Sequence, residues 1–208
     1  MTSGCTVSER VFERANDSAR SSPGSQAVER RGDVGQHDTR RDRAPVLPVV
    51  ADLDDAVSVR RAMEGAHGAF CVTNFWEHFS PQKEVVQAHT MAQAALDAGV
   101  KHVVWSTLED TREFVAPGSR MPVLMGKYNV PHYDGKGEAN RAFIDRGLPT
   151  TLLYTSFYWD NLIHFGMQPQ RGADGVLNFV LPMGEAKLPG IAAADVGVCA
   201  FDIFARGE

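Results

Sequence analysis

The sequence has little of what disulfide-linked, membrane-spanning or secreted proteins require. It has three cysteines in 208 residues, Cys5, Cys71 and Cys199. An odd number so widely spaced excludes a disulfide framework and fits a reducing compartment. No apolar run reaches membrane-spanning length, and the N-terminus lacks the apolar core of a secretory signal. The net charge of −5 gives no general attraction to nucleic acid or anionic membrane. We therefore expect a cytoplasmic protein.

Several motifs of catalysis and metal binding are also missing. The seven histidines show no metal-ligand spacing, and there is no Cys-x-x-Cys pair, so no metal site is expected. The nucleophile elbow of serine hydrolases is absent as well. The glycine-rich strand-to-helix loop that holds the pyrophosphate of a dinucleotide does not occur in the first 44 residues.

Residues 1–44 differ in composition from the rest of the chain. They contain eight Arg, no Lys, seven acidic residues and few large apolar side chains. Such a segment buries too little surface to offset its ordering entropy. A regulatory or nucleic-acid-binding arm is one interpretation, but acids alternate with the arginines and dilute any basic patch. We expect residues 1–44 to be a disordered or non-homologous leader, and residues 45–208 to form a partial NAD(P)-binding domain.

From residue 46 onward, strands and helices alternate. Apolar runs predict strands over 46–50, 69–72, 101–106, 150–154 and 176–181. Helical spacing and capping residues predict helices over 54–64, 81–98, 132–146 and 194–205. Residues 107–131 are expected to form a loop, and 157–165 a short helix or an aromatic loop. This alternation predicts an α/β fold, a doubly wound and mostly parallel Rossmann-like sheet.

The run 72–76 is the most informative part of the sequence. The apolar strand 69–72 stops at Thr73 and Asn74, and Phe75 and Trp76 follow. Ligands of parallel α/β sheets bind at the carboxyl ends of the strands. Small polar groups at such an end can satisfy ribose hydroxyls, and an aromatic ring can pack on a planar ligand. An ordinary strand exit would look similar, but we favour a ligand crevice.

Five segments together resemble the NmrA-like family of atypical short-chain dehydrogenases/reductases, in particular its NADPH-sensing branch. They are Val-Val-Ala-Asp-Leu-Asp-Asp at 49–55, Val-Thr-Asn-Phe-Trp-Glu at 72–77, Val-Val-Trp-Ser at 103–106, His-Tyr-Asp-Gly-Lys-Gly-Glu at 132–138 and Phe-Tyr-Trp-Asp-Asn-Leu at 157–162. The resemblance covers about residues 46–208. It implies a Rossmann fold that binds NADP, with NAD as an alternative, and a regulatory role with a protein partner. Related isoflavone reductases transfer hydride.

The resemblance also implies which residues touch the cofactor. The implied contacts are Asp52 and Leu53 at the adenine; Thr73, Asn74, Phe75 and Lys136 at the ribose and nicotinamide; His89 in place of a family lysine; and Tyr158, Trp159, Asp160 and Asn161 in a cofactor-facing loop. Each has a plainer interpretation: a helix cap for Asp52, a solvated side chain for Lys136, a helix-surface position for His89, and core packing for Trp159.

Two departures from the family pattern affect the expected function. The first strand with its Gly-x-x-Gly-x-x-Gly loop is missing, so we expect an incomplete sheet. The family also continues beyond the position of Glu208 into a small helical region. Lys136 is the one catalytic candidate. Tyr133 precedes it by three positions where the superfamily motif needs four, and Ser106 therefore lacks its usual tyrosine partner.

Three hypotheses follow. The first is an NADP(H)-binding, redox-sensing regulator without strong dehydrogenase activity, in which a flexible loop over 107–131 responds to the ligand. The second is an NADPH-dependent reductase of the isoflavone-reductase type, in which Lys136 assists protonation. The third is a degenerate fragment that binds no dinucleotide. The sequence does not indicate a substrate or an oligomeric state.

Overall fold

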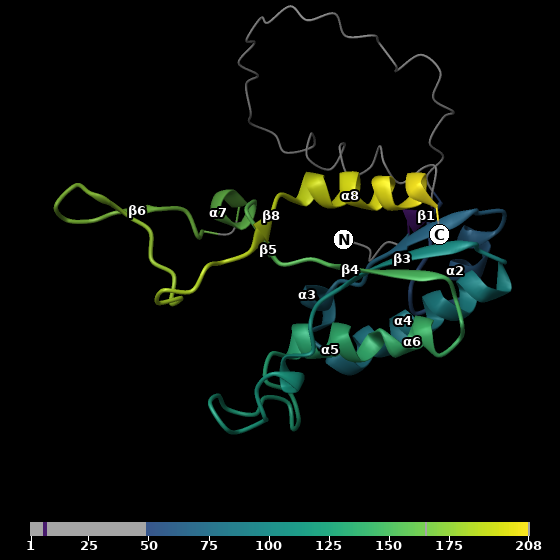
Figure 1. Cartoon of the computed structure of the whole chain (residues 1–208), viewed down its shortest axis with the longest axis horizontal. Coiled ribbons are helices and arrows are strands. Elements are labelled where there is room, and N and C mark those ends of the chain that lie inside the picture. Colours follow the sequence, from purple (N-terminus) through teal and green to yellow (C-terminus); the bar gives the residue numbers. More distant parts are fainter. Residues whose placement is uncertain (1–5, 8–48, 165, 208) are drawn as a thin grey trace, which may run out of the picture.

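The computed structural model describes residues 6–7, 49–164 and 166–207. A four-stranded sheet has the order β1-β2-β3-β4 and separates helices on its two sides (Figure 1). Strands β2 (Gly68–Cys71), β3 (His102–Thr107) and β4 (Thr150–Tyr154) are parallel, with Cys71 opposite Trp105 and Thr107 opposite Tyr154. This arrangement confirms the predicted α/β class with a mostly parallel sheet.

One face of the sheet carries the main core. Helices α2 (Ala56–Met63), α4 (Pro81–Asp97), α5 (Pro131–Ala139) and α6 (Arg141–Ile144) lie together on this side (Figure 1). The fully buried side chains between these helices and the sheet include Val59, Met63, Met91, Trp105 and Phe143. The indole of Trp105 and the ring of Phe143 have centroids 5.0 Å apart.

Local sequence signals set the ends of these helices. The Asp55 carboxylate accepts a hydrogen bond from the Val57 backbone N–H at the start of α2, and the Ser80 hydroxyl accepts one from Lys83 at the start of α4. Gly65 and Gly99 follow the two helices with φ of 73° and 68°, a conformation that glycine adopts without strain. The predicted helices over 54–64 and 81–98 are therefore confirmed.

The other face of the sheet is covered by α8 (Ala193–Arg206), which runs along it (Figure 1). Before α8, the chain forms β5 (Phe157–Tyr158), α7 (Asn161–His164), β6 (Gln170–Arg171), β7 (Leu177–Asn178) and β8 (Gly190–Ile191). β5 pairs with β8 in parallel, and β6 and β7 form a small antiparallel pair. The β6–β7 segment extends away from the rest of the molecule (Figure 1).

Three expectations differ from the structure. Val49 and Val50, the described part of the predicted strand 46–50, form no strand and are exposed. Within the expected leader, Thr6–Val7 forms β1, antiparallel to β2, and the remainder of residues 1–44 lies outside the described residues. The helix predicted over 132–146 is divided at Asn140, whose side-chain oxygen accepts hydrogen bonds from Trp105 and Thr107 on the sheet.

Shorter elements complete the description. The expected loop 107–131 contains a 3₁₀ turn, η1 (Thr111–Glu113), and the run after β2 forms α3 (Phe75–His78). The predicted strand over 176–181 is limited to the two residues of β7. None of the helices in the described residues combines the length and apolarity that crossing a bilayer requires.

Candidate functional site

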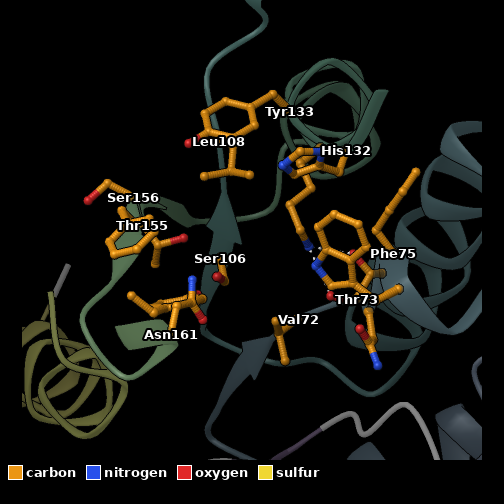
Figure 2. A pocket seen from close by; sticks show the side chains of 15 residues that line it. Val72, Thr73, Phe75, Ser106, Leu108, His132, Tyr133, Thr155, Ser156 and Asn161 are labelled. Carbon is orange, nitrogen blue, oxygen red and sulfur yellow. Dashed lines mark hydrogen bonds between the residues drawn. The ribbon is translucent and has the colours of Figure 1, made fainter. Parts of the chain in front are cut away.

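A cavity of about 490 Å³ lies at the carboxyl ends of β2, β3 and β4. Its walls come from the segments after these strands, from α5 and from α7. The lining residues are Val72, Thr73, Asn74, Phe75, Trp76, Ser106, Leu108, His132, Tyr133, Lys136, Thr155, Ser156, Phe157, Tyr158 and Asn161. Figure 2 shows Ser106 between two groups of side chains, with Thr155, Ser156 and Asn161 on one side and Thr73 and Phe75 on the other. This is the edge of a parallel sheet where ligands are expected.

Two glycines place Lys136 at this cavity. A Cβ atom on Gly135 would lie 3.0 Å from the Cβ of Pro81 at the start of α4, and one on Gly137 would lie 2.7 Å from the backbone nitrogen of Asp110. Helix α5 therefore approaches α4 on one side and the β3–η1 segment on the other more closely than larger residues allow. Lys136 stands between the two close contacts.

The Lys136 ammonium is held by three acceptors. It donates to the backbone oxygen of Thr73 at 3.0 Å and to the Thr73 hydroxyl at 2.8 Å, and it lies 3.3 Å from Oε2 of Glu84. It also lies 5.3 Å from the centre of the Trp105 ring. Burial lowers the pKa of Lys136, while the charge and hydrogen bond of Glu84 oppose that shift. Lys136 is thus a buried cation rather than a solvated surface side chain.

An aromatic group forms the wall around Phe75. The ring centroid of Phe75 lies 5.4 Å from that of Trp76 and 5.7 Å from that of His132, and the Trp76 and His132 rings lie 4.9 Å apart. Trp76 is 61% exposed although it lines the cavity, so much of this residue is accessible to solvent. Burial, with a smaller contribution from Lys136, lowers the pKa of His132, which keeps its imidazole neutral near pH 7.

Ser106 and Tyr133 add hydroxyl groups to the same cavity. Tyr133 precedes Lys136 by three residues on α5, which is close enough for both to face one side of the helix. Burial raises the pKa of the Tyr133 phenol, and Glu109 and Tyr158 raise it further. Its hydroxyl therefore stays protonated and is a weaker acid than that of a free tyrosine.

Two carboxylates of α5 hold both ends of the segment 107–131. Buried Asp134 accepts four hydrogen bonds, from the backbone N–H and hydroxyl of Thr111 and from the backbone N–H groups of Asn129 and Val130. Glu138 accepts from Lys127 at 2.7 Å and from Tyr128 at 3.4 Å. Both ends of this segment are therefore bonded to α5, and a response of the segment between them to a ligand stays a prediction.

The structure brings together six of the positions predicted to contact a cofactor. Thr73, Asn74, Phe75, Lys136, Tyr158 and Asn161 all line the cavity. They come from three stretches of the chain, 73–75, 136 and 158–161, which lie far apart in sequence. Their contact with a cofactor stays a prediction, but their common location is what that prediction requires.

The other five predicted positions lie outside the cavity lining. The Asp52 carboxylate accepts from the Asp54 N–H in the turn before α2, and Leu53 is 1% exposed within the core. His89 Nδ1 lies 3.0 Å from the Arg146 guanidinium on the helix surface. Burial, and then Arg146, lowers its pKa.

Trp159 and Asp160 contact the C-terminal segment instead. The Trp159 ring lies so close to Gly190 that any side chain there would overlap it, and Asp160 accepts from the Ala193 N–H at the start of α8 at 2.8 Å. Their observed contacts join the segment 157–164 to β8 and α8. These contacts match the packing interpretation that was also open for Trp159.

Some cavity residues were not singled out from the sequence. Thr155 and Ser156 follow β4 in the same way that Thr73 and Asn74 follow β2, so the signal of small polar residues after a buried strand could have found them. His132 had no such signal, because its position at the cavity depends on how α5 packs. Within the described residues, no three His, Cys, Asp or Glu side chains gather in a way that could hold a metal ion.

Comparisons with known proteins agree on one family. The sequence profile of the NmrA-like family matches residues 42–208. The nitrogen metabolite repression protein nmr of Neurospora crassa is 29% identical over 164 residues, which cover 74% of this chain and 30% of that protein. A crystal structure of NmrA, a negative transcriptional regulator, in complex with NADP is 25% identical with a TM-score of 0.59, covering 74% of this chain and 45% of that one.

A more distant similarity concerns the fold alone. The Citrobacter sp. triphenylmethane reductase complexed with NADP(H) is 18% identical, with a TM-score of 0.56 over 74% of this chain and 47% of that one. The chain thus spans about a third of the length of the curated relative and under half of these solved chains. Because the family profile covers most of the sequence and the parallel sheet agrees with it, this chain belongs to the NmrA-like family.

Proposed function

We propose that this chain binds the nicotinamide and ribose end of NADP(H) in the cavity at the carboxyl ends of β2, β3 and β4. The observation that carries the proposal is the common location of Thr73, Asn74, Lys136, Tyr158 and Asn161 in that cavity. The family resemblance in the sequence implies a cofactor contact at each of these positions. NAD is the alternative dinucleotide, since solved NmrA structures contain either NADP or NAD.

The chemistry of the cavity fits this half of the cofactor. A volume of about 490 Å³ lies within the range of roughly 300–1,000 Å³ typical of small-molecule sites. Hydroxyls from Ser106, Thr155 and Ser156 and the amide of Asn161 suit ribose and carboxamide groups, and the exposed residue Trp76 suits a planar ring.

The fit does not extend to the diphosphate. Helix N-termini bind phosphate through free backbone N–H groups. The N-termini of α2, α4 and α8 are capped by Asp55, Ser80 and Asp160. At the cavity, α5 begins with Pro131, which has no N–H, and α3 has only four residues, although neither has a side-chain cap. In residues 49–164 and 166–207, no glycine-rich turn joins a strand to a helix. The proposal for the described part of the chain is therefore restricted to the nicotinamide half.

We infer a regulatory role for this binding. Ordinary short-chain dehydrogenases use a tyrosine four residues before a lysine on one helix, whereas Tyr133 precedes Lys136 by three residues. The related NmrA is described as a negative transcriptional regulator. We propose a redox-responsive regulator that acts in the cytoplasm through a protein partner, with residues 45–208 as its partial NAD(P)-binding domain.

One observation favours the alternative function of an NADPH-dependent reductase. Ser106, Tyr133 and Lys136 line a single cavity, and these are the residue types of the superfamily's catalytic trio. If this function is correct, NADPH absorbance falls in the presence of carbonyl or quinone substrates, and Lys136→Ala abolishes that turnover. Equal rates in both proteins would exclude Lys136 as the proton-transfer group.

The binding proposal is tested by titrating the protein with NADPH while recording tryptophan fluorescence and heat. We expect saturable quenching, because Trp76 lines the cavity. Lys136→Ala should weaken binding by about 10-fold to 100-fold, the equivalent of one charge-assisted hydrogen bond of roughly 1.5–3 kcal/mol.

Lys127→Ala is the matched control, since Lys127 pairs with Glu138 outside the cavity lining and its loss should leave binding unchanged. If millimolar NADPH produces no change in fluorescence and no heat, the proposal is rejected. That result would favour a degenerate fragment that binds no dinucleotide.

A further inference from the structure

A buried polar cluster lies behind the cavity wall and joins three segments. Lys136 comes from α5, Glu84 from the first turns of α4, and Thr73 from the end of β2. The Glu84 side chain is fully buried, which is rare for a carboxylate unless it is paired. The cavity is thus lined by a cation whose counter-ion is inaccessible to solvent.

In this cluster Lys136 donates to Thr73, and Thr73 donates to Glu84. The Thr73 hydroxyl donates to Oε2 of Glu84 at 2.9 Å and accepts from Lys136 at 2.8 Å. Lys136 has three N–H donors, of which two donate to the two Thr73 oxygens. Glu84 Oε2 lies 3.3 Å from the ammonium as its counter-ion. A ligand hydroxyl that binds Lys136 therefore takes the third N–H or replaces a Thr73 oxygen.

The second oxygen of Glu84 faces a histidine. His78 Nδ1 accepts from the backbone N–H of Ser80 at 3.1 Å, so the proton of a neutral His78 lies on Nε2. That Nε2 is 3.7 Å from Glu84 Oε1, and both atoms are buried without a hydrogen-bond partner among the described residues. His78 is therefore oriented toward Glu84 from the side opposite Lys136.

We propose that Glu84 is a positioning residue, backed by His78, that keeps the Lys136 ammonium charged and in place for a ligand hydroxyl. The proposal rests on the function proposed above. Glu84 does not line the cavity and acts through Lys136. When a ligand hydroxyl replaces a Thr73 acceptor, the Glu84 contact keeps the ammonium at the cavity wall.

Three titratable groups from the described elements act on this cluster. Glu84 from α4 and His132 from α5 influence Lys136, and His78 from α3 faces Glu84. Only Glu84 among them carries a negative charge. Removing that charge should therefore make deprotonation of Lys136 easier.

The direct test is the titration of Lys136 by NMR of lysine side-chain carbons in the protein without ligand. The chain has five lysines, at 83, 101, 127, 136 and 187, and the signal that disappears in Lys136→Met assigns the site. In Glu84→Gln we expect the titration midpoint to fall by at least about one pH unit, a 10-fold change, because an opposite charge this close shifts a pKa by about one to three units.

Glu77→Gln is the matched control. It removes one negative charge from the exposed side of α3, where Glu77 influences Lys83 rather than Lys136, so the Lys136 midpoint should not move. A folded Glu84→Gln protein with an unchanged Lys136 midpoint would overturn the proposal.

A measurement on the wild-type protein covers the case in which Glu84→Gln does not fold. The Glu84 carboxyl carbon should change its chemical shift at the pH where Lys136 loses its proton, because the two groups are in contact. A Glu84 signal that does not respond to Lys136 deprotonation would contradict the proposal.

Binding then separates this inference from the proposed function. With reduced nicotinamide mononucleotide as the probe, Glu84→Gln should bind at least about 10-fold more weakly than wild type, whereas Glu77→Gln should bind equally. Equal binding by wild type and Glu84→Gln overturns the positioning role. No binding by wild type rejects the proposed function, and the ligand-free titration still decides whether Glu84 controls Lys136.

Discussion

The two faces of the sheet are packed very differently. On one face, α2, α4, α5 and α6 bury a continuous core that includes Trp105 and Phe143. On the other, α8 buries Val196 and Ala200 but leaves Phe201 51% exposed. The cavity lies at the sheet edge between these two faces. Lys136 is on the densely packed side, and Tyr158 and Asn161 are on the segment that leads to α8. One wall of the site is therefore rigidly supported, and the other depends on a few contacts.

A pair of phenylalanine substitutions tests this contrast with the largest expected effect. Phe143→Ala should destabilise the protein by about 3–5 kcal/mol, because it leaves a cavity beside Trp105. Phe201→Ala should cost less than about 1 kcal/mol, as is usual for partly exposed positions. Urea unfolding measures both values. Similar losses from the two variants would show that α8 is packed as firmly as α6.

Two aspartates provide a second comparison. Asp134→Ala leaves four donors of Thr111, Asn129 and Val130 without their acceptor. It should cost at least about 3 kcal/mol, since a buried unsatisfied group costs roughly 1–3 kcal/mol and Asn129 N–H is the buried one among three part-buried donors. Asp160→Ala removes a single bond to the start of α8 and should cost about 1 kcal/mol, like the loss of a helix cap. Thermal unfolding gives the ranking. A larger loss of stability in Asp160→Ala than in Asp134→Ala would contradict this ranking. It would show that the contact with α8 contributes more to stability than the bonds to Asp134.

Gly137→Ala examines how α5 reaches the cavity. Alanine favours a helix by about 1 kcal/mol over glycine. Its Cβ would nevertheless lie 2.7 Å from the Asp110 backbone nitrogen. We expect a net destabilisation of roughly 1–2 kcal/mol from this overpacking, and weaker NADPH binding. Gly135→Ala should cost less, since its closest contact is longer. Stabilisation by Gly137→Ala would mean that the β3–η1 segment moves freely.

The smallest expected effect concerns acid pH. The Arg112 guanidinium, bonded to Asp110 at 2.6 Å, lowers the pKa of that carboxyl below its usual value of 3.8. The stabilisation is complete above the unfolded pKa and is lost as pH falls through the folded pKa. The stability difference between wild type and Asp110→Asn should therefore shrink by up to about 1 kcal/mol between roughly pH 6 and pH 3. A difference that does not depend on pH would exclude the ion pair as its cause.

The sequence predicted the parts of the fold that local interactions determine. Helix starts at Asp55 and Ser80 and the stop at Gly99 need only neighbouring residues. The hydrogen bonds that the Asn140 side chain accepts, where the predicted helix is divided, come from Trp105 and Thr107 in β3, 35 and 33 residues away in sequence. No local pattern at Asn140 could have revealed them.

The same distinction applies to the site. Thr73 and Asn74 could be predicted to face a crevice because they end a buried strand. The contacts of Trp159 and Asp160 could not be predicted from local sequence, since the pairing of β5 with β8 joins residues about 30 apart and brings Trp159 to Gly190 and Asp160 to the start of α8. Glu84 looked like an ordinary residue in the first turns of α4, and its burial follows only from the packing of α4 against α5.

The central claim is that the described residues form the nicotinamide half of a dinucleotide site. It is tested most directly by saturation-transfer NMR with two halves of the cofactor, reduced nicotinamide mononucleotide and adenosine 2′,5′-bisphosphate. The account predicts saturation of the nicotinamide and ribose protons that NADPH displaces and that Lys136→Ala reduces, with no comparable signal from the adenosine compound. Binding of the adenosine compound alone would contradict it.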